Sequence, residues 1–294
     1  MATRTWIGTG AAPNDWTHPD NWSPSGVPTA GMHVYFEDSS VDCNTVSELD
    51  QSGVNLGSLN IDQSYTGSIG TASTPLQSQT PILNIGYHNG PGTPTGSPLL
   101  NIDLGADATD ITISNTGTSA DTTKAPVQLL NTNSSSTLIV YKGKVEVATG
   151  PGATAEFSKI TVSYDTNVAT DTDVFIGSGV TLATLDLLGG DTVLECAATT
   201  VTIKAGTLLT LGSGAIGTLN VNGGTVTSNS TGTITLLDIF GGAGLVDFTK
   251  NNSTRTVTAT KLDPTGSLKF NDSVIASFEV IPHTDNLNIT YRAT

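Results

Sequence analysis

An apolar–polar–apolar triplet, centred on Asn, Asp or Thr, recurs along nearly the whole chain. Alternation with a period of two residues is typical of a β-strand that buries one face. No segment of useful length keeps the 3.6-residue apolar period of an amphipathic helix. The pattern therefore predicts an all-β protein. The triplets begin at residues 59, 83, 100, 185, 219, 237 and 287 with Asn or Asp in the centre, and at 111, 160 and 201 with Thr.

The spacing of the later triplets indicates how the strands are arranged. Glycine follows four of them at intervals of 16–18 residues, at Gly190, Gly206, Gly224 and Gly242. Aligning these glycines brings one apolar residue of each unit into a common column, namely Leu187, Ile203, Val221 and Ile239. Stacked coils need the same inward residue and the same sharp turn at every level, and glycine accepts the positive φ of such a turn. We therefore expect a single-stranded parallel β-helix, or β-solenoid, with this column in its core; an antiparallel β-sandwich is the alternative.

Proline placement suggests the domain boundaries. All 13 prolines lie outside residues 152–263. Proline lacks an N–H group and interrupts a strand ladder, so this stretch is expected to be regular. We place the solenoid body at 53–263, with protruding loops at 70–98, and an N-terminal cap at 1–52. The repeat is lost from 264 onward, so 264–294 is expected to be an irregular C-terminal cap or oligomerisation segment.

All three tryptophans, Trp6, Trp16 and Trp22, fall in the predicted N-terminal cap. The end of a solenoid exposes unpaired strand edges and the end of the apolar core, so it needs a cover. We expect the three side chains to plug this end, and we favour the same end for docking to a partner. An exposed aromatic platform for carbohydrate is the alternative.

Charge narrows the range of partners. The 294 residues include 26 Asp and Glu against 11 Lys and Arg, for a net charge of −15. Such a surface repels phosphate, so we expect no nucleic-acid partner and no anionic membrane partner. No apolar run approaches the roughly 18 residues of a membrane span. The start of the chain has no apolar segment typical of a secretory signal. Cys43 and Cys196 are expected to be buried free thiols, as in a protein made in a reducing cytoplasm.

Candidate chemistry is sparse. The four histidines lack the spacing of a zinc site. Paired carboxylates could serve a glycosidase or hold Ca²⁺, and alternating charges on a strand usually form a solvated face. The candidates are the pairs Asp107 with Asp110 and Asp171 with Asp173, and the alternating set Lys142, Lys144 and Glu146. We predict that the protein is not an enzyme and that it carries no cofactor and no metal.

The N-terminal motif resembles a known group of proteins. Trp6-x-Gly8, Asp15-Trp16, Asn21-Trp22 and Pro28 are similar to the opening of bacterial and phage β-solenoid surface proteins. The stretch 59–70 resembles the first coil of proteins encoded among tailed-phage structural genes, and the repeats of 185–242 resemble the same group. The resemblance implies a virion surface protein, either a capsid cement (decoration) protein or a fibre-like adhesin. It supplies no catalytic residues.

These observations lead to one functional expectation. We expect a non-enzymatic structural protein on the virion surface of a tailed bacteriophage, assembled in the host cytoplasm and bound to the major capsid protein. A homotrimer is expected because the end of one narrow, acidic column offers little contact area. Three columns side by side present a wider contact surface. A receptor-binding tail fibre or surface adhesin is the alternative, and a polysaccharide depolymerase is a third candidate.

Overall fold

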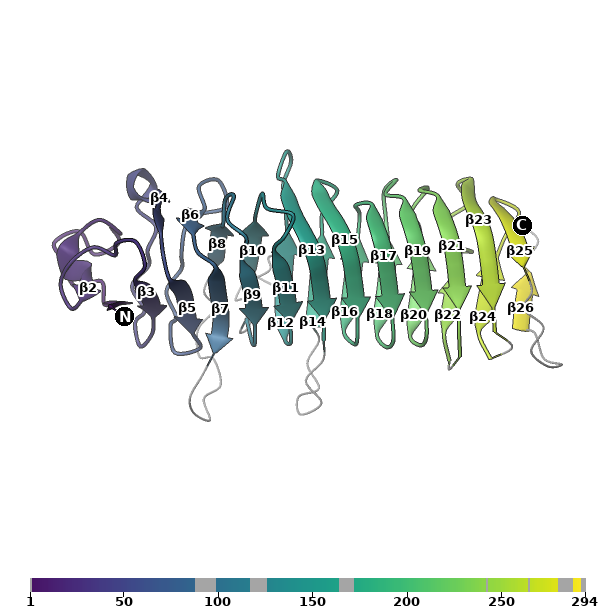
Figure 1. Ribbon diagram of the computed structural model, residues 1–294, viewed down its shortest axis with the longest axis horizontal. Coiled ribbons are helices and arrows are strands. Elements are labelled where there is room, and N and C mark those ends of the chain that lie inside the picture. The colour runs from purple at the N-terminus through teal and green to yellow at the C-terminus, as the bar shows by residue number, and fades with distance from the viewer. Residues whose placement is uncertain are drawn as a thin grey trace.

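The computed structural model of the chain describes residues 2–87, 99–116, 126–163, 172–241, 243–263, 265–279 and 288–291. These residues form an elongated column of stacked strands, with the N-terminal and C-terminal segments at opposite ends (Figure 1). The strands make two sheets, and successive strands from β3 onward alternate between them. The described chain contains two short 3-10 helices, at Pro19–Asn21 and Val46–Glu48, and no α-helix.

The first sheet, sheet A, has 14 strands and the second, sheet B, has 12. Sheet A contains β1 (Thr3–Trp6), β2 (Trp22–Ser23), β3 (His33–Phe36), β5 (Ser58–Asp62), β7 (Ile82–Tyr87), β9 (Asp110–Ile113), β11 (Thr137–Val140), β13 (Ala155–Val162), β15 (Val180–Leu187), β17 (Ala198–Ile203), β19 (Ile216–Val221), β21 (Ile234–Ile239), β23 (Arg255–Leu262) and β25 (Val274–Glu279). Sheet B contains β4 (Asp50–Asn55), β6 (Leu76–Gln79), β8 (Leu100–Asp103), β10 (Val127–Leu130), β12 (Gly143–Val147), β14 (Thr172–Ile176), β16 (Asp191–Leu194), β18 (Thr207–Thr210), β20 (Thr225–Ser228), β22 (Leu245–Asp247), β24 (Ser267–Phe270) and β26 (Asn288–Tyr291).

The strands pair in parallel throughout the described chain, except that β2 lies antiparallel on β1. Each coil contributes one strand to each sheet, and the apolar side chains fill the space between the sheets. The predicted all-β parallel solenoid is therefore confirmed, and the antiparallel sandwich is excluded.

One ladder of apolar side chains runs along the inner face of sheet A. The predicted column residues Leu187, Ile203, Val221 and Ile239 pair in succession, and each is fully buried. The ladder extends past them in both directions, to Leu262 on one side and to Val162, Val140, Ile113, Ile85, Ile61, Phe36 and Trp6 on the other. Since adjacent strands lie about 4.8 Å apart, every side chain of the ladder covers its neighbours.

The corner after these strands requires glycine. Gly190, Gly206 and Gly224 have φ values of +74°, +83° and +69°, which side chains with a Cβ rarely adopt. A Cβ on Gly206 would also lie 2.2 Å from the carbonyl oxygen of Gly190 in the preceding coil. The fourth predicted glycine, Gly242, lies outside the described residues, and its neighbour Gly241 has a φ of +65°.

Two predicted boundaries need correction. Within the predicted loops at 70–98, residues 76–79 form the regular strand β6, whereas β7 contains the predicted triplet at residue 83; residues 88–98 lie outside the described chain. The segment 264–294 is not irregular throughout, because β24, β25 and β26 continue the two sheets. A register shift between Val257 and Thr260, where β23 pairs with β25, disturbs the sequence period while strand pairing continues.

A second type of corner uses short polar side chains. At six places in the described chain the carboxylate of Asp accepts a hydrogen bond from the backbone N–H two residues later, an Asx turn that replaces a backbone bond. The six pairs are Asp15 with Thr17, Asp50 with Ser52, Asp62 with Ser64, Asp103 with Gly105, Asp247 with Thr249 and Asp263 with Thr265. Short polar side chains therefore supply part of the hydrogen bonding at these corners.

The turn at Asp247 predicts an acid-dependent loss of stability. Burial acts to raise the pKa of Asp247, but two bonds from Thr249, at 2.8 and 2.7 Å, and the charges of Lys250 and Lys269 outweigh it and lower that pKa. A carboxyl with a lowered pKa stabilises the folded state above its unfolded pKa of about 3.9, and this contribution is lost as the pH falls through the folded value. We expect Asp247→Asn to lower the free energy of unfolding at pH 7 and the deficit to shrink towards pH 3. Urea unfolding of both proteins at pH 7 and pH 3 measures the difference in free energy of unfolding. A difference that did not change with pH would contradict a stabilising role for the ionised Asp247 carboxylate.

The two cysteines are free and buried, as predicted. Burial raises the pKa of the Cys196 thiol to about 12 and raises that of Cys43 further. Since the thiolate is the reactive form, both should stay unreactive at pH 9, where an exposed cysteine is largely ionised. We expect fewer than about 0.1 thiols per chain to react with a disulfide reagent in the native protein. Two should react after denaturation, and rapid native labelling of either would show that its coil opens.

Candidate functional site

The predicted aromatic cap forms a single cluster. The rings of Trp6 and Trp16 lie 5.0 and 4.7 Å from that of Trp22, in edge-to-face geometry, and Phe36 and Tyr65 extend the cluster into the first coils. Edge-to-face contacts at such distances favour aromatic rings beyond the area that they bury. Trp6 is also the first member of the ladder that contains Val221, so the cap and the core are one structure.

The cap also covers a strand edge. Strand β2 lies antiparallel on β1, opposite β3, and places Trp22 beside Trp6. The indole N–H of Trp22 donates to the Trp16 carbonyl oxygen at 2.7 Å, and that of Trp6 donates to the Val41 carbonyl oxygen at 3.0 Å. The tryptophans therefore close the N-terminal end of the core, while β2 shields the edge of sheet A.

The burial of the tryptophans excludes docking through their side chains, whereas docking of the N-terminal end through its other residues stays a prediction. None of the three exposes more than 1% of its surface. A ring that is buried in an aromatic cluster offers no face to a sugar or to a partner protein. The alternative of a carbohydrate platform built from these residues fails for the same reason.

Asn21 explains the Asn-Trp pair of the N-terminal motif. Its side chain is fully buried, and its amide donates to the carbonyl oxygens of Ala12 and Asp15 at 2.7 and 2.8 Å. Its side-chain oxygen accepts a bond from the Gly10 N–H at 2.7 Å. Asn21 therefore ties the cap loop together from inside, which is a structural role.

Of the two predicted carboxylate pairs, only Asp107 with Asp110 lies within the described residues, and the two residues make different polar contacts. The carboxylate of Asp110 accepts a bond from the Thr137 hydroxyl at 2.8 Å, while Asp107 contributes its backbone oxygen to Thr109 and Ser136. Asp171 lies outside the described residues. Within the part of the chain that the structure describes, no group of three or more His, Cys, Asp or Glu side chains could hold a metal ion.

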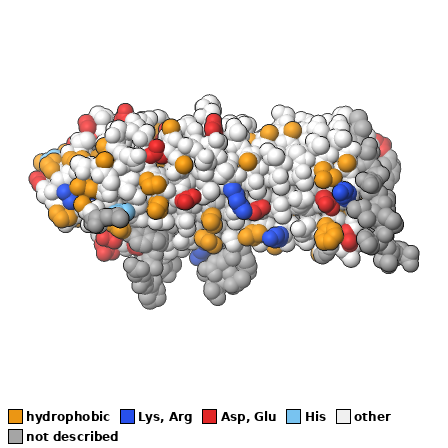
Figure 2. All heavy atoms as spheres, in the orientation of Figure 1, with side chains coloured by type: hydrophobic (Ala, Val, Ile, Leu, Met, Phe, Trp, Pro, Cys, Tyr) orange, Lys and Arg blue, Asp and Glu red, His pale blue; other side chains and the backbone are white. Residues whose placement is uncertain are grey.

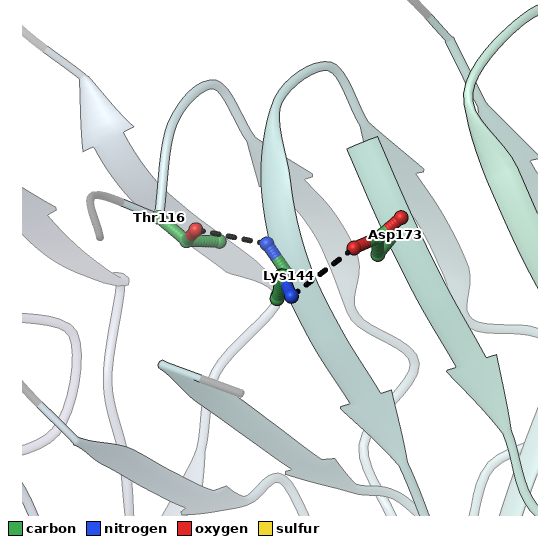
Figure 3. A network of polar contacts seen from close by, with 3 residues as sticks. All are labelled: Thr116, Lys144 and Asp173. Atoms are coloured by element: carbon green, nitrogen blue, oxygen red, sulfur yellow. Dashed lines mark hydrogen bonds and ion pairs between the residues drawn. The ribbon is translucent and has the colours of Figure 1, made fainter. Parts of the chain in front are cut away.

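Asp173 belongs instead to a polar network on the outer face of sheet B (Figure 3). Its carboxylate lies 3.3 Å from the Lys144 ammonium on the neighbouring strand. The backbone N–H of Lys144 donates to the Thr116 hydroxyl at 3.1 Å. Lys144 and Glu146 alternate on the outward face of β12, as predicted for a solvated strand, and Lys142 precedes that strand.

A short apolar stripe crosses the same outer face. Phe175, Val193 and Leu209 occupy equivalent positions on β14, β16 and β18, and Glu146 stands next to Phe175 on β12. Phe175 exposes 37% of its surface and is one of six exposed large apolar side chains in the described chain. Sequence reasoning missed it, because a single outward Phe does not disturb the alternating pattern of its strand.

A shallow hollow of about 180 Å³, which we call the β14 hollow, lies beside Phe175. Its lining is mixed, and it includes Glu146, Thr149, Phe175, Ile176, Gly177, Val193 and Glu195. The hydroxyl of Thr149 donates to the Glu146 carboxylate at 2.8 Å and so holds one wall. A second hollow, of about 80 Å³, shares Glu146 and Thr149.

Gly177 allows the close approach of two coils beside the hollow. It follows β14 directly, and a Cβ at this position would lie 2.1 Å from the Ala148 carbonyl oxygen of the preceding coil. In the next coil, the Glu195 N–H donates to the Ile176 carbonyl oxygen at 2.9 Å, which places Glu195 beside Gly177. Glu146 and Glu195 thus reach the lining from the coils on either side of β14.

The rest of the visible surface is largely neutral. Figure 2 shows a face dominated by uncharged polar side chains and backbone, with charged groups and apolar atoms scattered over it. Within the described chain, no helix is long and apolar enough to cross a membrane.

By its fold, the chain is a parallel β-solenoid with a closed aromatic end and an acidic hollow on one flank. No family model, no curated protein and no solved structure matches it. The resemblance to phage solenoid proteins thus stays an expectation based on the N-terminal motif, the stretch 59–70 and the repeats of 185–242.

Proposed function

We propose that the protein is a non-enzymatic structural component of a virion surface, namely a capsid cement protein that binds the major capsid protein of a tailed phage. The observation that carries the proposal is the continuous ladder from Trp6 to Leu262, together with the two parallel sheets around it. Because each coil packs against its neighbours, the column resists bending. It also offers long, regular flanks for contact. The resemblance of the cap motif to phage solenoid proteins supports the same function.

The burial of the tryptophans changes how docking is expected to occur. The cap provides a closed, stable end, and its rings make no contact with a partner. The flank formed by sheet B offers an exposed aromatic ring and polar neighbours, which suits an interface better than the interior of the cap does. We therefore place the capsid contact on this flank.

The proposal includes a homotrimer on the virion surface, assembled in the host cytoplasm. Three columns around a threefold axis satisfy repeated contacts without an open, aggregating face. The charge of −15 per chain opposes close packing through acidic residues, so the contacts should run along Thr and Val positions. Light scattering should give about 90 kDa for three chains of 30.1 kDa, and a stable 30 kDa monomer would remove the trimer.

Electron microscopy of particles labelled with an antibody against the protein tests the main proposal. A cement protein should label the whole head in a regular array. Heads that lack it should disassemble at a lower temperature than heads to which the purified protein has been added. Label confined to the tail tip would contradict the cement function and support the receptor-binding alternative. Particles without label would contradict both functions.

A receptor-binding fibre or adhesin is the second candidate, favoured by the exposed Phe175 between two carboxylates. A depolymerase is the third. Purified protein incubated with host capsule or lipopolysaccharide should release no oligosaccharide if the protein is not an enzyme. Release of sugars would establish a catalytic function and contradict the proposal.

A further inference from the structure

The β14 hollow has the chemistry of a receptor for a cation. An aromatic ring attracts a cation placed over its face within about 6 Å, and a carboxylate pairs with it. Phe175 supplies the ring, while Glu146 and Glu195 supply carboxylates from the coils on either side. Val193 adds apolar surface, against which the carbon stem of a long side chain can pack, whereas the Ile176 side chain is fully buried in the core.

The charge around the hollow is complementary to a cation. Besides Glu146 and Glu195, Asp173 and Asp191 stand next to each other on the outer face of β14 and β16. Lys144 pairs with Asp173, and Lys142 precedes β12, so four carboxylates stand against two ammonium groups on this part of the flank. Such a surface concentrates cations and disfavours anionic glycans.

The size of the hollow selects a side chain over a sugar. Its volume of about 180 Å³ is below the roughly 300–1,000 Å³ that is usual for small-molecule sites. A guanidinium group with two methylenes has about six non-hydrogen atoms, whereas a pyranose with its hydroxyls has about twice as many. The shallow opening on a strand flank also suits a group presented by another protein surface.

We propose that the β14 hollow binds an Arg or Lys side chain of the partner protein and so anchors the solenoid flank to it. This inference rests on the proposed docking to a protein lattice and identifies the chemistry of the contact. The cation lies above Gly177, against the Phe175 ring, between the carboxylates of Glu146 and Glu195. Thr149 holds Glu146 in place through its hydroxyl bond.

The first experiment uses a small probe and the purified full-length chain. Spectra of the two methyl groups of Val193 are recorded by NMR during titration with n-butylguanidinium, and separately with its neutral isostere n-butylurea. We expect both methyl signals to shift with the cation and to saturate at millimolar concentrations. Butylurea should produce no saturable shift, and added salt should weaken the cation binding.

Variants assign the effect to the hollow. The double variant Glu146→Gln with Glu195→Gln should bind butylguanidinium about tenfold more weakly, and Phe175→Leu severalfold more weakly. Glu156→Gln, which removes one carboxylate on sheet A, is the matched control and should bind as the wild type does. Absent shifts, equal shifts with butylurea or an unchanged affinity of the double variant would each overturn the inference. Saturable shifts with methyl glucoside but none with the cation would overturn it in favour of a sugar site.

The second experiment separates this inference from the proposed function. Heads that lack the protein are mixed with the wild type, the double variant or Glu156→Gln, and bound protein is measured after sedimentation. We expect the wild type and Glu156→Gln to bind and the double variant to lose at least about 90% of the binding. If the double variant bound like the wild type, the hollow would not be the docking site, although the cement function would stand. If the wild type bound butylguanidinium but not heads, the cement function would fail.

Discussion

Val221→Asp is expected to lower the free energy of unfolding by about 3–5 kcal/mol at pH 7, because it buries an unpaired carboxylate. Val221 is fully buried and pairs with Ile203 and Ile239 in the ladder of sheet A. Apolar neighbours in both adjacent coils leave the carboxylate no donor. Burial raises the pKa of such a group, so the loss should be smaller at pH 4, where the carboxyl binds a proton. Urea unfolding followed by circular dichroism measures both values.

The matched control is Thr218→Asp on the same strand. Thr218 faces outward between Thr200 and Leu236, so the new charge remains in water. This variant should change the stability by less than about 0.5 kcal/mol. If Val221→Asp unfolded at the same urea concentration as Thr218→Asp, the ladder would not be the core of the protein.

Trp22→Ala is expected to cost about 3–5 kcal/mol, the usual range for a large aromatic side chain removed from a core. Trp22 packs against Trp6, Trp16 and Phe36 and donates its N–H to the Trp16 carbonyl oxygen. In a solenoid each coil contacts only its neighbours, so the damage should concentrate near the cap. Hydrogen exchange should therefore accelerate in β1, β3 and β5 and remain unchanged in β17–β21.

An exposed aromatic residue serves as the comparison for the cap. Tyr141 exposes 40% of its surface at a corner of the column, and Tyr141→Ala should change the stability by less than about 1 kcal/mol. Faster exchange across all coils in Trp22→Ala would show that the solenoid unfolds as one unit. Unchanged exchange in β1 and β3 would show that the tryptophans do not close the end.

Much of the fold was predictable because the coils repeat. Once glycine corners and apolar columns recur at nearly constant spacing, the register of β15 to β21 follows from the sequence alone. The early coils are longer and less even, so the same alignment does not extend to them. Strands such as β6 were consequently mistaken for part of a loop.

The candidate site was not predictable, because it depends on contacts between coils. Glu146, Phe175 and Glu195 are distant in sequence and become neighbours only through the pairing of β12, β14 and β16. The buried Arg255 is a similar case. Its guanidinium donates to the carbonyl oxygens of Ser228 and Asn251, and no sequence pattern connects those three residues.

The aromatic cap also gives the column a direction of growth. Because Trp6 opens the ladder and β2 covers the outer edge of β1, the end that the ribosome makes first is also the end that is sealed first. Each later strand of sheet A then emerges next to a finished strand, which acts as its template, and the edge at β1 is already covered. Folding during synthesis can therefore proceed coil by coil, and in sheet A a chain that is still incomplete exposes only its growing edge to another chain.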